Sequence, residues 1–118
     1  MKKIEVTHIQ SGKILGGQIE WAKNPWERMK GLLGKDRLTR GSGLLITPCN
    51  SIHTFFMRFS IGVIFLDKKF NVVKVFPRIV PWRVTRIYFK AYQTLELPVD
   101  VDIRGISAGD TLGVKCIN

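Results

Sequence analysis

Apolar and polar residues alternate along much of the chain, and this period of two is typical of half-buried β-strands. Residues 2–22 alternate on either side of a Ser11-Gly12-Lys13 turn, which predicts a hairpin. Similar short runs separated by turn residues predict further strands. These predicted strands cover residues 44–48, 52–58, 61–66, 72–76, 94–98, 99–103 and 111–117.

One stretch has helical spacing instead. Asn24 is a good N-cap, Pro25 suits the first helical position, and Glu27 complements the helix dipole. We therefore expect a helix of about two to three turns that begins near Pro25 and ends near Gly34. The residues of its apolar face are Trp26, Met29 and Leu33.

The longest apolar run, residues 51–67 (SIHTFFMRFSIGVIFLD), is too long to be one strand. Fully extended, it would span about 56 Å at roughly 3.3 Å per residue, whereas a domain of this size has a radius of gyration of about 13 Å. Polar residues and Gly62 interrupt the run after Met57, so we expect a bend there, with His53 on the first strand. Residues 77–93 mix two prolines with basic and aromatic residues, which predicts a long basic excursion that is strand only in part.

Many short strands and one helix predict a mainly β fold, a compact sandwich or irregular barrel. The 118 residues fit a single domain, and the apolar fraction of 45% is ordinary for a globular protein. Glu5 and His8 stand where a secretory signal needs apolar residues, and no uncharged run supplies the ~20 apolar residues of a membrane span. We therefore expect a soluble cytoplasmic protein.

The charge is distributed unevenly. The net charge is +10, and residues 37–95 contain ten basic residues and one acid, Asp67, so this segment alone carries +9. Such a field attracts nucleic acid, anionic lipid headgroups or acidic proteins. A solvated basic surface that aids solubility explains the same charge equally well.

The two cysteines and two histidines offer limited chemistry. Cys49, His53, Cys116 and His8 could together form a four-ligand metal set, but the chain lacks a close ligand pair such as C-x-x-C. We therefore predict no metal, no cofactor and two free, buried thiols. Cys49 and His53 could also be the nucleophile and base of a hydrolase, although residues four apart on a strand lie about 13 Å from each other. No complete catalytic constellation is visible, so enzymatic activity stays open.

Two other features suggest binding. Glu96 lies between two leucines of a strand-like run, where we expect it to face solvent or to pair with an arginine. Residues 82–92 alternate aromatic rings with cations, which can stack bases and hold phosphates, although no RNP, KH or helix-turn-helix pattern is present. The residues of this nucleic-acid alternative are Lys74, Arg78, Arg83, Arg86 and Lys90.

The motifs GLLGK, IHTFFM, VIFLDK, LEL and the final GD together resemble the uncharacterised prokaryotic domain family numbered 192 among the domains of unknown function. The resemblance covers about residues 3–116 and implies a mainly β fold with a short helix, without an assigned activity. It also implies an acid where this chain has Gly62, and Ala-Gly where it has Val99 and Asp100. The positions that match are His53, Thr54, Met57, Pro81, Trp82 and Glu96.

From these observations we expect a small binding or interaction module that takes an anionic small molecule, a peptide or an acidic protein surface at a shallow site. Nucleic-acid binding through residues 58–90 and a Cys/His hydrolase are the alternatives. The expected ligand-binding residues are His53, Thr54, Arg58, Trp82 and Glu96.

Overall fold

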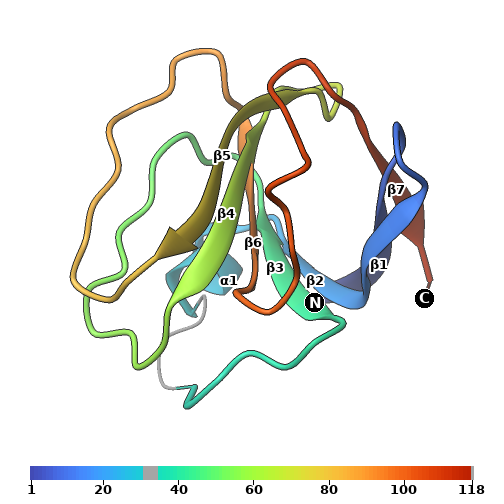
Figure 1. Cartoon of the computed structure of the whole chain (residues 1–118). Coiled ribbons are helices and arrows are strands. Elements are labelled where there is room, and N and C mark those ends of the chain that lie inside the picture. Colours follow the sequence, from blue (N-terminus) through green and yellow to red (C-terminus); the bar gives the residue numbers. More distant parts are fainter. Residues whose placement is uncertain (31–34, 118) are drawn as a thin grey trace.

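The computed structural model describes residues 1–30 and 35–117. Within them the chain forms seven strands, with one short helix after the first hairpin (Figure 1). The elements in chain order are β1 (Lys2–His8), β2 (Lys13–Ala22), α1 (Pro25–Lys30), β3 (Ser42–Ile46), β4 (Ile61–Leu66), β5 (Val72–Ile79), β6 (Gln93–Pro98) and β7 (Leu112–Cys116).

The strands form one seven-stranded sheet in the order β5-β4-β6-β3-β2-β1-β7. Neighbouring strands are antiparallel except β2 and β3, whose parallel pairing is reached through the crossover that contains α1. The sheet is strongly curled into a half-barrel, with β1 and β7 opposite β4 and β5 (Figure 1). The expectation of a mainly β fold with one short helix is therefore confirmed.

An apolar cluster covers each face of the curled sheet, because successive side chains of a strand point to opposite faces. Ile4 of β1 and Ile64 of β4 share the first cluster although other strands separate them in the sheet, so this cluster fills the inside of the curl. Val63 and Phe65 of β4 belong to the second cluster, on the outside. Burial of apolar surface on both faces is the main favourable term for this fold.

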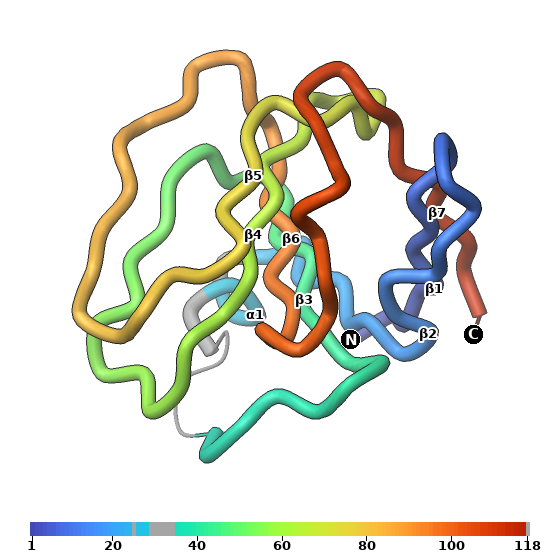
Figure 2. Tube along the Cα trace, in the orientation of Figure 1, coloured from blue at the N-terminus to red at the C-terminus, as the bar shows by residue number. Residues whose placement is uncertain are grey.

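Two irregular segments cover the outer cluster. Residues 47–60 and 80–92 both leave the sheet on the same side and run along each other (Figure 2). Ile52 and Met57 from the first segment, and Ala91 from the second, are buried in the outer cluster. These segments therefore complete the hydrophobic core without adding strands to the sheet.

The strand predicted at residues 52–58 is wrong. The segment contains only an isolated bridge, between His53 and Val84. Phe56 has a φ of 64°, in the left-handed region, and this conformation interrupts an extended run.

The strand predicted at residues 99–103 is also wrong. Val101 and Ile103 are buried in the inner cluster, but they lie in turns, where the Val101 N–H donates to the Pro98 carbonyl (3.2 Å). The alternation of apolar residues here reflects a loop that buries every second side chain. Cys49 and Cys116 are free as expected, but Cys49 is only half-buried and Cys116 is exposed.

The helix begins at Pro25 as predicted. Its first turn is capped because the Glu27 N–H donates to the Asn24 side-chain oxygen (2.8 Å). Trp26 was expected on an apolar face, yet 67% of it is exposed. Among the described residues, no helix is long and apolar enough to cross a membrane. The side chain of Met29, and residues Leu33 and Gly34, lie outside the described part of the chain.

Candidate functional site

Four adjacent strands bring their ends together at one edge of the half-barrel. β6 is antiparallel to both β3 and β4, so its C-terminal end meets the starts of those strands. β5 is antiparallel to β4, and the pairing of Ile61 with both Ile79 and Pro98 brings the end of β5 to the same edge. The segment before β3, the start of β4 and the ends of β5 and β6 are therefore neighbours in space.

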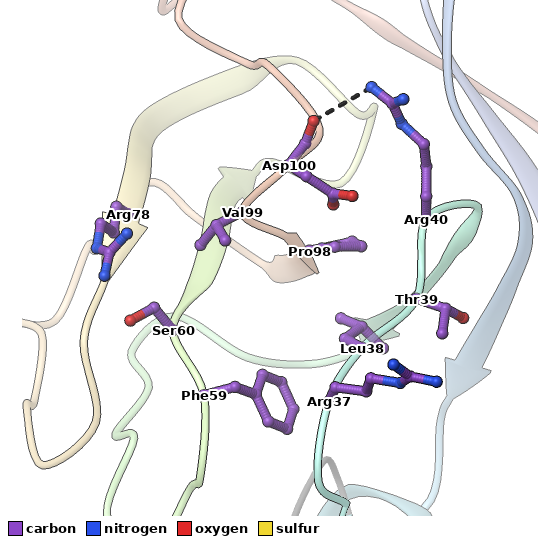
Figure 3. Close-up of a pocket in the computed structure, with 10 residues that line it drawn as sticks. All are labelled: Arg37, Leu38, Thr39, Arg40, Phe59, Ser60, Arg78, Pro98, Val99 and Asp100. Carbon is purple, nitrogen blue, oxygen red and sulfur yellow. Dashed lines mark hydrogen bonds between the residues drawn. The ribbon is translucent and has the colours of Figure 1, made fainter.

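A pocket of about 530 Å³ lies at this edge. Its middle is partly apolar, with Phe59 and Pro98, and three arginines lie at its periphery, Arg78 on one side and Arg37 and Arg40 on the other (Figure 3). The lining residues are Arg37, Leu38, Thr39, Arg40, Phe59, Ser60, Arg78, Pro98, Val99 and Asp100. We call this cavity the arginine pocket.

The arginines of this pocket are largely free to bind. Arg40 donates one hydrogen bond to the Asp100 backbone oxygen (3.2 Å), which anchors it at the rim (Figure 3). Arg37 and Arg78 make no hydrogen bond or ion pair through their side chains with any other residue in the described part of the chain. Asp100 is the one acid in the lining, so the pocket has an excess of positive charge.

This pocket was not among the sites predicted from the sequence. Arg37 and Arg40 counted only toward the basic segment, and Arg78 was assigned to the nucleic-acid alternative. The only indication of the pocket in the sequence is that its arginines lie near the ends of predicted strands. Which strand ends meet depends on the order of the strands in the sheet, and that order was not predicted.

Three of the five expected ligand-binding residues do come together, where the two irregular segments meet. His53 is exposed and stacks on Phe55 (5.1 Å between ring centroids), and Phe55 lies 6.0 Å from Trp82. Thr54 is completely buried beneath them. The ring of His53 therefore lies at the surface rather than in the core.

The buried Thr54 joins the two segments. Its hydroxyl donates to the Val80 carbonyl (2.7 Å) and accepts the Arg83 N–H (2.9 Å). Its carbonyl accepts the Trp82 N–H (3.0 Å), which holds Trp82 at a φ of 66°. A left-handed conformation costs a non-glycine residue about 1–2 kcal/mol, so these hydrogen bonds maintain a strained backbone. The Thr54 hydroxyl is thus engaged in structure.

The other two expected residues lie elsewhere. Arg58 is exposed and forms an ion pair with Asp36. Glu96 lies on β6, where its cross-strand partners are Leu44 of β3 and Val63 of β4. The five residues therefore do not form one constellation, and a site made of all five stays a prediction.

Glu96 is neither solvent-facing nor paired with an arginine, so both expectations for it are wrong. Only 6% of the residue is exposed, and its carboxylate has no hydrogen bond or ion pair with any residue that the structure describes. Burial raises the pKa of the Glu96 carboxyl from 4.5 to about 7. Gly62, where an acid was implied, pairs with Leu97 and so faces the inner cluster, on the opposite face from Glu96.

The chemistry of Cys49 does not favour a nucleophile. Its thiol donates to the Ser51 carbonyl (3.1 Å), and its own carbonyl accepts the Thr94 hydroxyl (3.1 Å). Burial raises the pKa of the Cys49 thiol, and the charge of Glu96 raises it further, which disfavours the reactive thiolate. No hydrogen bond between described atoms links Cys49 to His53, so the Cys/His hydrolase gains no support.

The second histidine has a structural role. His8 lies within 2.7 Å of the Ser11 hydroxyl through Nδ1 and within 2.8 Å of the Asp110 carboxylate through Nε2. The Ser107 N–H and His8 hold the pKa of the Asp110 carboxyl below its usual value. These contacts tie the first hairpin to the turn before β7.

The cations of the nucleic-acid alternative are all exposed. Two lie on β5, and three lie on the segment 80–92. Their exposure is compatible with phosphate contacts but equally with a solvated surface, so a nucleic-acid interface stays a prediction. These residues are Lys74, Arg78, Arg83, Arg86 and Lys90.

Comparison with known proteins identifies the family and the fold. A solved structure from Novosphingobium aromaticivorans, a protein of unknown function, has a TM-score of 0.77 at 21% identity over 94% of this chain and 83% of its own. A second, from Sinorhizobium meliloti and described as a putative transcription regulator, has a TM-score of 0.78 at 19% identity over 96% and 92%. No curated protein matches. The family model of DUF192, described as Uncharacterized ACR, matches residues 6–114, and the chain therefore belongs to this uncharacterised family.

Proposed function

We propose that the protein is a binding module that takes a small anionic ligand, with a carboxylate or phosphate group, in the arginine pocket. The observation that carries this proposal is the excess of guanidinium groups around a cavity of suitable size. The proposed ligand is anionic, as expected from the sequence, but the proposed site differs from the one expected at His53, Thr54, Arg58, Trp82 and Glu96.

The size of the cavity supports a small molecule. Pockets for small ligands commonly measure about 300–1,000 Å³, and the arginine pocket, at about 530 Å³, lies within this range. A second cavity beside Cys49 measures about 230 Å³ and lies below it. The larger cavity is therefore the better candidate.

The chemistry of the lining defines the ligand further. A guanidinium group offers a fork of N–H donors that matches the two oxygens of a carboxylate or phosphate. The side chains of Arg37 and Arg78 have no competing partner among the described residues, so a ligand does not need to break an existing ion pair. Phe59, Pro98 and Val99 offer apolar contact to the rest of the molecule. We infer a ligand with an anionic head and a short apolar body.

Calorimetric titration tests this proposal with inorganic phosphate, a phosphate monoester and a medium-chain carboxylate as probes. Hydrogen bonds to charged groups contribute roughly 1.5–3 kcal/mol each, so the variant Arg37→Gln/Arg78→Gln is expected to bind at least about tenfold more weakly. The matched control Lys69→Gln/Lys115→Gln removes the same charge elsewhere and is expected to retain affinity. Equal loss in both variants, or no binding of any probe to the wild-type protein, contradicts the proposal.

Titration with single-stranded RNA at several salt concentrations separates this proposal from nucleic-acid binding. A nucleic acid held by several phosphate contacts loses affinity steeply as salt rises, by roughly 0.7–0.9 log unit per log unit of salt for each contact. Its binding is expected to depend on Arg83, Arg86 and Lys90, which do not line the arginine pocket.

A further inference from the structure

Exposed apolar side chains are concentrated on the two irregular segments. Of the thirteen large apolar side chains that are exposed in the described part of the chain, seven lie at residues 55–56 and 82–92. We call these seven the aromatic face. They are Phe55, Phe56, Trp82, Val84, Ile87, Phe89 and Tyr92.

Backbone hydrogen bonds hold the two segments of this face in fixed register. The Thr54 N–H donates to the Arg83 carbonyl (2.8 Å), and the Thr85 N–H donates to the Ile52 carbonyl (2.9 Å). Both segments project from the same side of the half-barrel (Figure 2). The two segments that carry the aromatic face therefore form one hydrogen-bonded unit rather than two independent loops.

Its rings are presented to solvent although the backbone beneath two of them is strained. Phe56 and Trp82 both have positive φ, and their rings contact each other edge to face with 4.8 Å between the centroids. Even so, Phe56 is 69% exposed, and Phe89 is 86% exposed. Rings that are held in strained conformations without being buried indicate a surface that is covered by a partner.

The charge around this face specifies the partner. Arg83, Arg86 and Lys90 alternate in sequence with the exposed apolar residues and are exposed themselves, and residues 68–95 contain no acid. Arg86 lies 5.3 Å over the ring of Tyr88, a half-buried residue that packs against the outer cluster. An apolar projection surrounded by cations complements an anionic bilayer, where rings enter the interface and cations contact the headgroups.

The apolar residues favour a bilayer over a nucleic acid. Bases are bound by the faces of aromatic rings, but Val84 and Ile87 have no such face and are exposed beside the rings. Trp82 already contacts Phe55 and Phe56. An interface of hydrocarbon and headgroups accommodates aliphatic and aromatic side chains alike.

We propose that the aromatic face docks the protein peripherally on an anionic lipid bilayer, with the rings of residues 55–56 and 82–92 entering the interface and the adjacent cations on the headgroups. This surface is separate from the arginine pocket, because none of its seven residues lines that pocket. The proposal therefore does not depend on the proposed function.

Sedimentation with vesicles tests the docking. The wild-type protein is expected to bind phosphatidylcholine vesicles that contain about 30% phosphatidylglycerol, to bind pure phosphatidylcholine much more weakly, and to dissociate as salt rises. The variant Arg83→Gln/Arg86→Gln/Lys90→Gln is expected to bind about a hundredfold more weakly. The control Lys2→Gln/Lys69→Gln/Lys115→Gln removes the same charge elsewhere and is expected to bind within a few-fold of wild type.

A second pair of variants tests the rings. Phe56→Asn/Phe89→Ser removes two exposed rings while placing at position 56 a residue that tolerates positive φ, and we expect at least about tenfold weaker binding. Ile14→Ser, at an exposed apolar site on β2, is the control. Thermal melts that match wild type establish that both variants fold.

Several results overturn the docking proposal. These are equal loss in the variants and their controls, equal binding to neutral vesicles, or binding of single-stranded RNA with no binding of anionic vesicles. Arg37→Gln/Arg78→Gln is expected to keep vesicle binding, so failure of the arginine pocket and failure of the docking surface are distinguishable.

Discussion

Glu96 gives the sharpest prediction about stability, because a carboxylate without partners among the described residues lies in the centre of the sheet. Its pKa is raised from 4.5 to about 7 by burial, so the folded state holds the proton more tightly than the unfolded state does. The contribution of Glu96 to the free energy of unfolding therefore decreases as the pH rises from about 4.5 to about 7, and it is constant at higher pH. A tenfold difference in proton affinity between the two states corresponds to about 1.36 kcal/mol, so the total change is about 3 kcal/mol.

The variant Glu96→Gln removes this dependence, since glutamine has nearly the same shape and does not titrate. We expect the variant to gain about 3 kcal/mol over wild type between pH 4.5 and pH 8, most of it between the unfolded pKa of 4.5 and the folded pKa of about 7. Urea unfolding at a series of pH values measures this difference, and titrations of all other groups cancel between the two proteins. Glu5→Gln on β1 is the matched control for replacing a strand glutamate by glutamine.

A constant difference between Glu96→Gln and wild type across the whole pH range refutes the reasoning. That result means that the Glu96 carboxylate is solvated or has a compensating partner in solution. A carboxyl resonance of Glu96 that titrates near its ordinary value in nuclear magnetic resonance leads to the same conclusion.

Two further predictions concern the contacts that fix the loops. Thr54→Val leaves the Val80 carbonyl and the Arg83 N–H without their hydroxyl partner, so we expect the free energy of unfolding in urea to fall by about 1–3 kcal/mol. The control Thr54→Ser keeps the hydroxyl and is expected to retain most of the stability. Equal effects of the two variants contradict the role of the hydroxyl. Asp110→Asn removes a carboxylate whose pKa is lowered by the Ser107 N–H and His8. This carboxylate stabilises the folded state above the unfolded pKa of 3.8, and the stabilisation is lost as the pH falls through the pKa of the folded state. We expect the variant to be less stable at neutral pH and to lose less stability than wild type on acidification, and parallel acid-unfolding curves argue against this contact.

The local elements follow largely from the order of residues. The hairpin of β1 and β2, the helix start at Pro25, and strands β3 to β7 lie where alternation and turn residues predict them. These signals are local, because each depends on a period of two or on a capping residue within a few positions. The same local signals failed at residues 52–58 and 99–103, where tertiary contacts give buried side chains to irregular backbone.

The candidate site shows the limit of this reasoning. The residues that line the arginine pocket come from four strand ends that are distant in sequence, and they meet because β6 inserts between β3 and β4. Glu96 has the sequence context of an ordinary half-exposed strand, and it is the tertiary structure that buries it.

The sequence by itself determined a mainly β chain of one family, with an uneven positive charge and aromatic residues mixed with cations at residues 82–92. These properties depend on residue type and short spacing. Only the tertiary structure decided that His53 is exposed, that Glu96 is buried, and that Arg37 and Arg78 share a pocket. The physical reason is that burial and proximity depend on strand order and on how loops fold over the sheet, and these are set by the chain as a whole.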